Sequence, residues 1–139
     1  MRTRIAISLV CLAAMLACSD PAAADWRRLS NADLHALYQQ INQRYFRGQL
    51  RDVPVVWADL ASHSAMGETE FSRDRGIRIE IDPKWNRTEE HLIGVIEHEA
   101  CHVYFVQAGV HPSKEQSHGQ PFQSCMARYG RVSPRPYAE

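Results

Sequence analysis

Two histidines separated by three residues, inside an apolar stretch, constrain this chain more than any other feature. They are His98 and His102 in the run His98-Glu99-Ala100-Cys101-His102. In an α-helix, residues four apart lie on one face about 6 Å apart, so two imidazoles at this spacing can bind one metal ion. Glu99 follows the first histidine and lies close to such an ion without binding it. Zinc hydrolases of the zincin type hold their general base at this position, so the run predicts a zinc site if it is helical.

The surrounding residues predict that helix. From Thr88 to Gln107 the apolar residues recur with a helical period and dominate the second half, which indicates a largely buried helix. Thr88 can cap its beginning, and Gly109 marks its end. Two unpartnered imidazoles in so apolar a helix would be costly. This cost favours metal ligands over two ordinary hydrogen-bonded histidines.

A catalytic zinc ion usually has three protein ligands and leaves its fourth position to water. His118 is the best candidate for the third ligand. It lies 118 − 102 = 16 residues after His102, which leaves room for the helix to end and the chain to return. Gly119 beside it allows close backbone approach. His111, in a predicted loop, is the second candidate.

Other candidates fit less well. His91 precedes His98 by seven residues, a rise of roughly 10 Å along the helix axis, which is too far for a shared zinc ion. The metzincin position, six residues past the second ligand, is Ala108. Glu115 lies in a predicted loop and Glu139 is the last residue.

The N-terminal residues 1–24 have the features of a signal peptide. Two arginines precede an apolar stretch, residues 5–17, that is too short for an ordinary membrane span, and residues 22–24 are alanines suited to cleavage. Alternatively the segment is a lipoprotein signal that ends before Cys18, or an uncleaved anchor. We expect a mature domain of residues 25–139 that is periplasmic or extracellular, with membrane attachment only if Cys18 is lipidated.

The charge balance argues against a nucleic-acid partner. The chain has 16 basic and 16 acidic side chains. Removing Arg2, Arg4 and Asp20 with the leader leaves 14 basic and 15 acidic side chains. Nucleic-acid binding requires a basic excess on some surface, and the composition provides none.

Two cysteines, Cys101 and Cys125, remain in the mature domain whichever cleavage occurs. Export makes a disulfide between them chemically allowed. A small buried thiol explains Cys101 equally well.

The remaining patterns predict a small α+β domain. A capping-box start at Ser30 opens a helix, three short strands follow, and the metal helix and a C-terminal helix complete the chain. The predicted elements are a helix from Ser30 to Phe46, strands over 53–57, 66–71 and 77–81, the helix over 88–107, and a helix over 120–129. In the third strand isoleucines alternate with charged residues, and we expect its edge to pair with an extended substrate.

In this order the residues resemble the SprT-like zinc metallopeptidase family, over about Leu34 to Tyr129. The matching residues are Leu37-Tyr38, Asn42, Tyr45-Phe46, Gly48, Leu50, Trp57, Gly67, the run from His98 to His102, His118-Gly119, Phe122 and Met126. The resemblance implies a minimal zincin-like fold with His98, His102 and His118 on zinc.

The resemblance also implies that Glu99 is the general base and that Cys101 is a family-typical thiol rather than a disulfide cysteine. Intracellular members act near DNA, some on proteins crosslinked to it. We do not carry that role over, because this chain has an export signal and no basic surface in its composition.

The sequence thus predicts an exported, monomeric zinc-dependent metalloendopeptidase that acts on proteins or peptides. A zinc-bound water would attack the peptide bond, and Glu99 would take its proton. The alternatives are a zinc-stabilised binding module without activity and a zinc amidase acting on cell-wall peptides. Tyr104 and Tyr129 are candidate oxyanion donors, although a tyrosine in an apolar helix belongs more often to the core.

Overall fold

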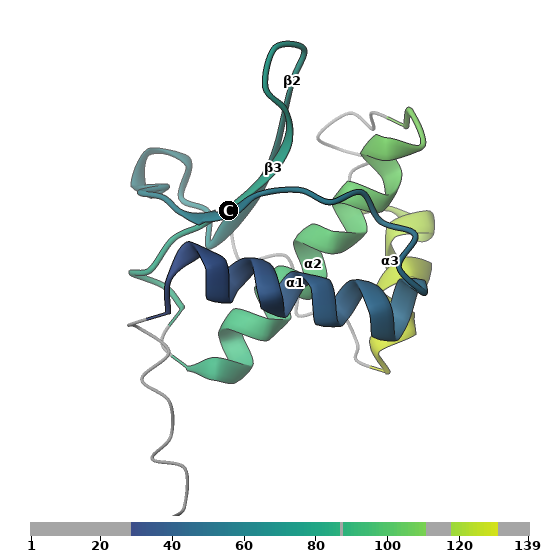
Figure 1. Ribbon diagram of the computed structural model, residues 1–139, viewed down its shortest axis with the longest axis horizontal. Helices are drawn as coiled ribbons and strands as arrows, with labels where there is room; N and C mark the ends of the chain where they lie inside the picture. Colours follow the sequence, from purple (N-terminus) through teal and green to yellow (C-terminus); the bar gives the residue numbers. More distant parts are fainter. Residues whose placement is uncertain (1–28, 87, 111–117, 131–139) are drawn as a thin grey trace, which may run out of the picture.

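The computed structural model describes residues 29–86, 88–110 and 118–130, and these form the expected α+β fold (Figure 1). The elements are α1 (Asn31–Phe46), β1 (Val55–Trp57), the short 3-10 helix η2 (Ala61–His63), β2 (Gly67–Ser72), β3 (Gly76–Ile81), α2 (Glu89–Gln107), α3 (Gln120–Met126) and the 3-10 helix η3 (Ala127–Tyr129). The signal peptide with Cys18, the second-choice ligand His111, and the carboxylates Glu115 and Glu139 lie outside the described residues.

Local signals set the ends of α1. The Ser30 hydroxyl accepts a hydrogen bond from the Asp33 backbone N–H at 3.2 Å, and the Asp33 carboxylate accepts one from the Ser30 N–H at 2.7 Å. This capping box satisfies N–H groups that have no partner within the helix. The helix ends at Phe46. The backbone of the capping residue Arg47 is in the left-handed conformation, and Gly48 follows with a φ of +73°. The predicted stop at Gly48 is therefore confirmed.

The sheet has the strand order β1-β3-β2, with β3 parallel to β1 and antiparallel to β2. The expectation that strand 77–81 offers an edge to substrate is wrong, because β3 is the central strand and has a neighbour on each side. Alternating isoleucines indicate which face of a strand is buried, but they do not indicate which strand lies at the edge. That alternation is confirmed: Ile79 and Ile81 are fully buried, whereas Arg78 lies on the outer face and pairs with Glu70.

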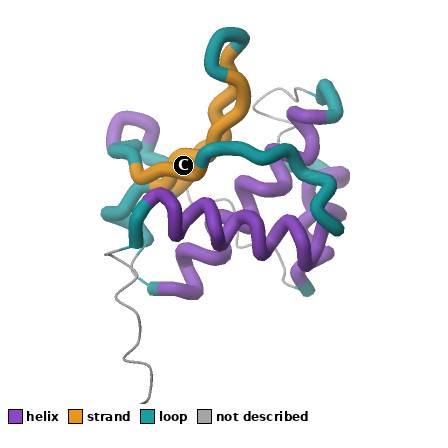
Figure 2. The backbone as a smooth tube through the Cα atoms, in the orientation of Figure 1, coloured by secondary structure: helices purple, strands orange, loops and turns teal. Residues whose placement is uncertain are grey.

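Helix α2 is the centre of the domain and contacts α1, α3, β2 and β3. In Figure 2 the helices lie together beside the strands, and the β2–β3 hairpin extends beyond them. The core between the layers includes Leu34 and Tyr38 of α1, Ile79 of β3, and Ile96 and Val103 of α2, each with 0% exposure. Because α2 packs against these four elements, its orientation is fixed, and the direction of the side chains on its remaining face is fixed with it.

A disulfide joins Cys101 in α2 to Cys125 in α3, with the two Cα atoms 6.0 Å apart. The family resemblance implied a free thiol at Cys101, and the structure corrects that expectation. The pairing depends on how α3 packs against α2, which a sequence separation of 24 residues does not reveal.

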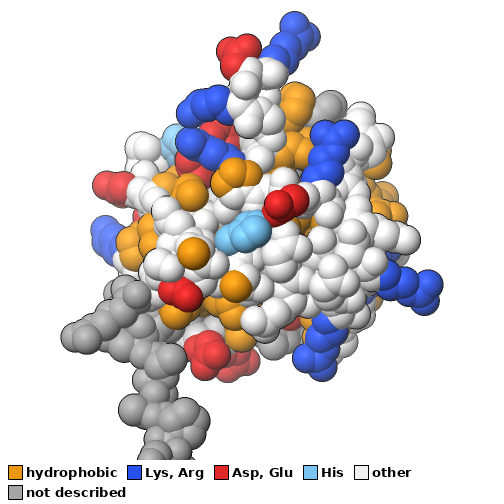
Figure 3. Space-filling view, in the orientation of Figure 1, with side chains coloured by type: hydrophobic (Ala, Val, Ile, Leu, Met, Phe, Trp, Pro, Cys, Tyr) orange, Lys and Arg blue, Asp and Glu red, His pale blue; other side chains and the backbone are white. Residues whose placement is uncertain are grey.

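The surface carries both signs of charge. On the face seen in Figure 3, the basic side chains of the described residues are scattered and do not gather into one patch. Among the helices that the structure describes, none combines the length and the apolar character needed to cross a membrane.

Candidate metal centre

Helix α2 presents its functional residues because of how its ends and faces are fixed. The Thr88 hydroxyl caps the first turn by accepting from the His91 N–H at 3.1 Å, as the sequence predicts. Ala100 and Val103 are fully buried and direct one face of the helix into the core. His98 and His102 lie on a half-buried face, next to the beginning of α3.

The three predicted ligands come together at one point. The Nε2 atom of His98 lies 3.0 Å from that of His118 and 3.3 Å from that of His102, and the His102–His118 distance is 3.3 Å. Three nitrogens bound tetrahedrally to one zinc ion at about 2.0–2.1 Å would lie about 3.3 Å from each other. The cluster therefore fits one metal ion, and these three histidines are a group that could hold one.

Phe122, in the first turn of α3, packs against all three histidine rings. Its ring centroid lies 4.8 Å from His98, 4.6 Å from His102 and 4.9 Å from His118. The Nδ1 atom of His98 is buried and has no hydrogen-bond partner among the described residues. Packing on Phe122, rather than a hydrogen bond at Nδ1, thus orients this ring.

The environment of the rings favours their neutral form. Burial, with the neighbouring histidines, lowers the pKa of His98 to about 3, and burial with His118 lowers that of His102 to about 4. The pKa of His118 is also lowered by burial. Because only a neutral imidazole has a lone pair for a metal, the rings are in the metal-binding form at neutral pH.

Glu99 lies beside the cluster and faces β2. It is only 4% exposed, and its Oε2 atom accepts a 2.7 Å hydrogen bond from the Thr69 hydroxyl. Burial raises the pKa of Glu99 to about 7, while the Thr69 bond acts in the opposite direction. A carboxyl group with this pKa can both accept and donate a proton near neutral pH.

Gly67 allows β2 to approach α2 this closely. A Cβ atom at Gly67 would lie 2.5 Å from Cγ1 of Val95 and 3.3 Å from Cγ of Glu99. Any larger residue would therefore push the strand away from the helix. The sequence analysis noted Gly67 only through the family resemblance and did not identify Thr69. A threonine in a short predicted strand has no spacing that relates it to Glu99, so no local signal could have found it.

The two candidate oxyanion donors lie elsewhere. The Tyr129 hydroxyl donates to the Glu97 carbonyl at 2.9 Å, and the side chain is 8% exposed, so Tyr129 belongs to the core. The Tyr104 ring packs against Phe46 with centroids 5.9 Å apart and against the Arg128 guanidinium at 4.9 Å. Neither tyrosine contacts the histidine cluster through any of these interactions.

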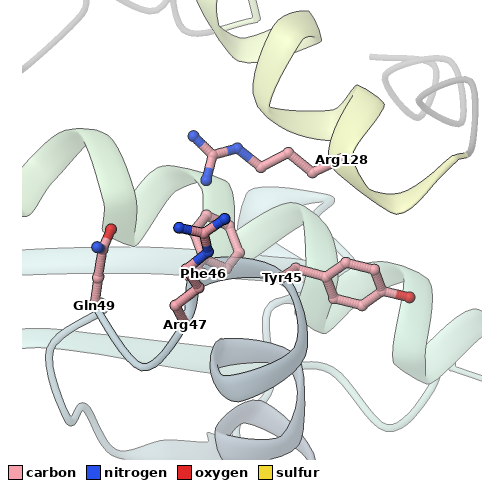
Figure 4. Close-up of a pocket in the computed structure, with 5 residues that line it drawn as sticks. All are labelled: Tyr45, Phe46, Arg47, Gln49 and Arg128. Atoms are coloured by element: carbon pink, nitrogen blue, oxygen red, sulfur yellow. The ribbon is translucent and has the colours of Figure 1, made fainter.

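A separate hollow of about 370 Å³ lies at the end of α1 (Figure 4). Its walls come from the end of α1, the turn after it and η3: Tyr45, Phe46, Arg47, Gln49 and Arg128. It contains no residue of the histidine cluster, and its two guanidinium groups are not metal ligands. We therefore assign the candidate site to α2 and the beginning of α3.

The fold and the cluster define a small α+β protein with a three-histidine site able to hold one metal ion. The chain belongs to the SprT-like family, whose model matches residues 34–138. No curated protein and no solved structure shows significant similarity to it.

Proposed function

We propose that this protein is an exported zinc-dependent metalloendopeptidase. The observation that carries the proposal is a buried carboxylate, Glu99, beside three histidines whose Nε2 atoms are spaced for one ion. A purely structural metal site would need the histidines but not Glu99. Membership of the SprT-like family supports the same activity.

The donor set favours zinc, because three imidazoles in a tetrahedral arrangement with one open position are typical of catalytic zinc. Zinc bound here would act as a Lewis acid that activates water and polarises a carbonyl group. Glu99 would accept a proton from the attacking water and deliver it to the leaving amine. The Thr69 hydroxyl restrains the Glu99 carboxylate by donating a hydrogen bond to its Oε2 atom.

The free edge of β2 is the best candidate for holding the substrate. Among the described strands, β2 pairs only with β3, so its other edge can pair with an extended chain. Thr69 of the same strand contacts Glu99, so a chain paired to β2 would lie near the cluster. This edge replaces that of β3 as the expected substrate-binding edge.

Two features support a location outside the cytoplasm. The N-terminal residues 1–24 have the pattern of a signal peptide. The Cys101–Cys125 disulfide suits an oxidising compartment such as the periplasm or the extracellular medium. Membrane attachment would require lipidation at Cys18.

Cleavage of an unfolded protein by the zinc-loaded chain is the decisive test. We expect fragments from the wild type and a loss of rate of roughly 10²–10⁴-fold in Glu99→Gln, with one zinc ion per chain retained in both. Glu90→Gln is the matched control, since Glu90 is an exposed carboxylate on the same helix. It should cleave like the wild type.

Other outcomes of this test would favour the alternative functions, the zinc-stabilised binding module or the cell-wall amidase. One bound zinc ion with no cleavage of any protein would contradict the proposal and favour the binding module. Cleavage of cell-wall peptides alone would favour the amidase. A wild-type chain that binds no zinc would remove the basis of all three functions.

A further inference from the structure

We propose that Phe71 selects the substrate, by packing against a bulky apolar side chain on the N-terminal side of the cleaved bond. The inference rests on the proposed function, because it places the substrate along the free edge of β2. Phe71 would be a specificity residue and not a catalytic one.

Phe71 lies on the face of β2 that turns towards α2. Side chains alternate between the two faces of a strand, so residues 67, 69 and 71 share one face. The position of Gly67 faces Val95 and Glu99, and the Thr69 hydroxyl bonds to Glu99. Residue 71 therefore continues the face of β2 that contacts Glu99.

The opposite face of β2 has a different chemistry. Glu68 bonds to His63 at 2.6 Å, and Glu70 pairs with Arg75 and Arg78 at 2.9 and 2.7 Å. These charged groups stabilise the outer face of the hairpin and do not turn towards α2. The β2 face with Phe71 thus carries no charged side chain of the strand, whereas the outer face is ionic.

The exposure of Phe71 is unusual for its position. Its register partner on β3, Ile77, is 7% exposed, whereas Phe71 is 49% exposed. Figure 1 shows that this part of the hairpin extends beyond the helices. About half of the surface of this aromatic side chain is therefore exposed to solvent, at the end of the β2 face that contacts Glu99.

The direction of the strand places this contact on one side of the cleaved bond. β2 runs from Gly67 to Ser72, and an antiparallel substrate would run in the opposite direction. Antiparallel pairing is the slightly more stable arrangement. Phe71 lies two residues beyond Thr69, about 7 Å along the strand, so it would meet a substrate residue N-terminal to the reacting bond.

The ring offers no hydrogen bond and no charge, so the substrate class follows from apolar contact. A large aliphatic or aromatic side chain would cover the exposed ring, whereas alanine or a charged residue would not. Leucine has three more carbon atoms than alanine, and covering about half of that added surface corresponds to roughly a tenfold preference for leucine.

The test compares matched peptides that differ only in leucine or alanine at successive positions upstream of the cleaved bond. We expect the wild type to cleave the leucine peptide about tenfold faster in kcat/KM at one of these positions. Phe71→Ala should remove this preference by lowering kcat/KM for the leucine peptide, and Phe71→Leu should retain most of it. Trp85→Ala is the control, since Trp85 is also exposed (42%) but follows the opposite end of β3.

Binding separates this inference from the proposed function. If no variant cleaves any peptide, the same peptides are titrated against zinc-loaded Glu99→Gln with and without Phe71→Ala. A tenfold difference in Kd that requires Phe71 would support the inference even though peptidase activity fails. An equal preference for leucine in wild type and Phe71→Ala, or no peptide binding at all, would overturn it. Melting temperatures close to that of the wild type would show that the variants are folded.

Discussion

At the scale of single residues, the site depends on how closely β2 approaches α2. Thr69 can reach the Glu99 carboxylate at 2.7 Å only because Gly67, two residues earlier, has no side chain. The two residues act together. Gly67 allows the short distance between β2 and α2, and Thr69 donates a hydrogen bond to Glu99 across it. This pairing explains why a residue that bears no functional group should matter for the position of Glu99.

We predict that Gly67→Ala destabilises the fold by about 1–3 kcal/mol and lowers activity, because the new methyl group would overlap Cγ1 of Val95. Chemical denaturation measures the first effect and peptide cleavage the second. The double variant Gly67→Ala/Val95→Ala provides the control, since shortening Val95 leaves space for the added methyl. It should lose less stability than the sum of the two single variants. Additive losses would show that the contact does not exist.

At the scale of elements, α3 is the one that needs outside support. It has seven residues, and a helix this short is not stable alone in water. Phe122 is buried against the histidine rings, and Cys125 is bonded to α2. His118 lies two residues before Gln120, the first residue of α3, so whatever fixes α3 also restrains the third predicted ligand.

We predict that Cys101→Ser/Cys125→Ser lowers the free energy of unfolding by roughly 3 kcal/mol, the value expected for a closed loop of this size. The zinc affinity should fall as well, because His118 is then held less firmly. Urea denaturation and competition with a chelator measure the two effects. Wild type treated with a reductant should match the double variant, and unchanged stability in both would contradict the prediction.

The sequence predicted the elements well, since their signals are local. Ser30 and Thr88 cap helices in the structure as expected, and Gly48 ends α1. The cluster of His98, His102 and His118 was also predictable, since helical spacing fixes two members and chain length restricts the third. The central place of β3 and the disulfide were not, because both depend on how distant elements pack.

At the scale of the whole molecule, metal binding should contribute much of the stability. The domain is small, and its candidate ligands come from two segments that the chain separates by 16 residues. An ion that binds only the folded state adds stability according to its concentration relative to Kd, about 4 kcal/mol at a thousandfold excess. Small domains convert each kcal/mol into several degrees of melting temperature.

We therefore predict that removing zinc with a chelator lowers the melting temperature by on the order of 10 °C or more. Differential scanning calorimetry with and without added zinc measures the shift. His118→Ala should show a much smaller shift, whereas His91→Ala should behave like the wild type, since His91 is exposed and outside the cluster. Equal shifts in the two variants would place the ion elsewhere.

The disulfide also affects how fast the folding chain binds its metal ion. Cys101–Cys125 and the pair His102–His118 connect the same two segments of chain. Once either link has formed, the partners of the other are confined to a small volume, which raises their effective concentration. Oxidation would therefore accelerate metal capture, and a captured ion would accelerate oxidation. The disulfide and the metal site would therefore form cooperatively. A chain that already has one of the two links would form the other sooner than a chain that has neither.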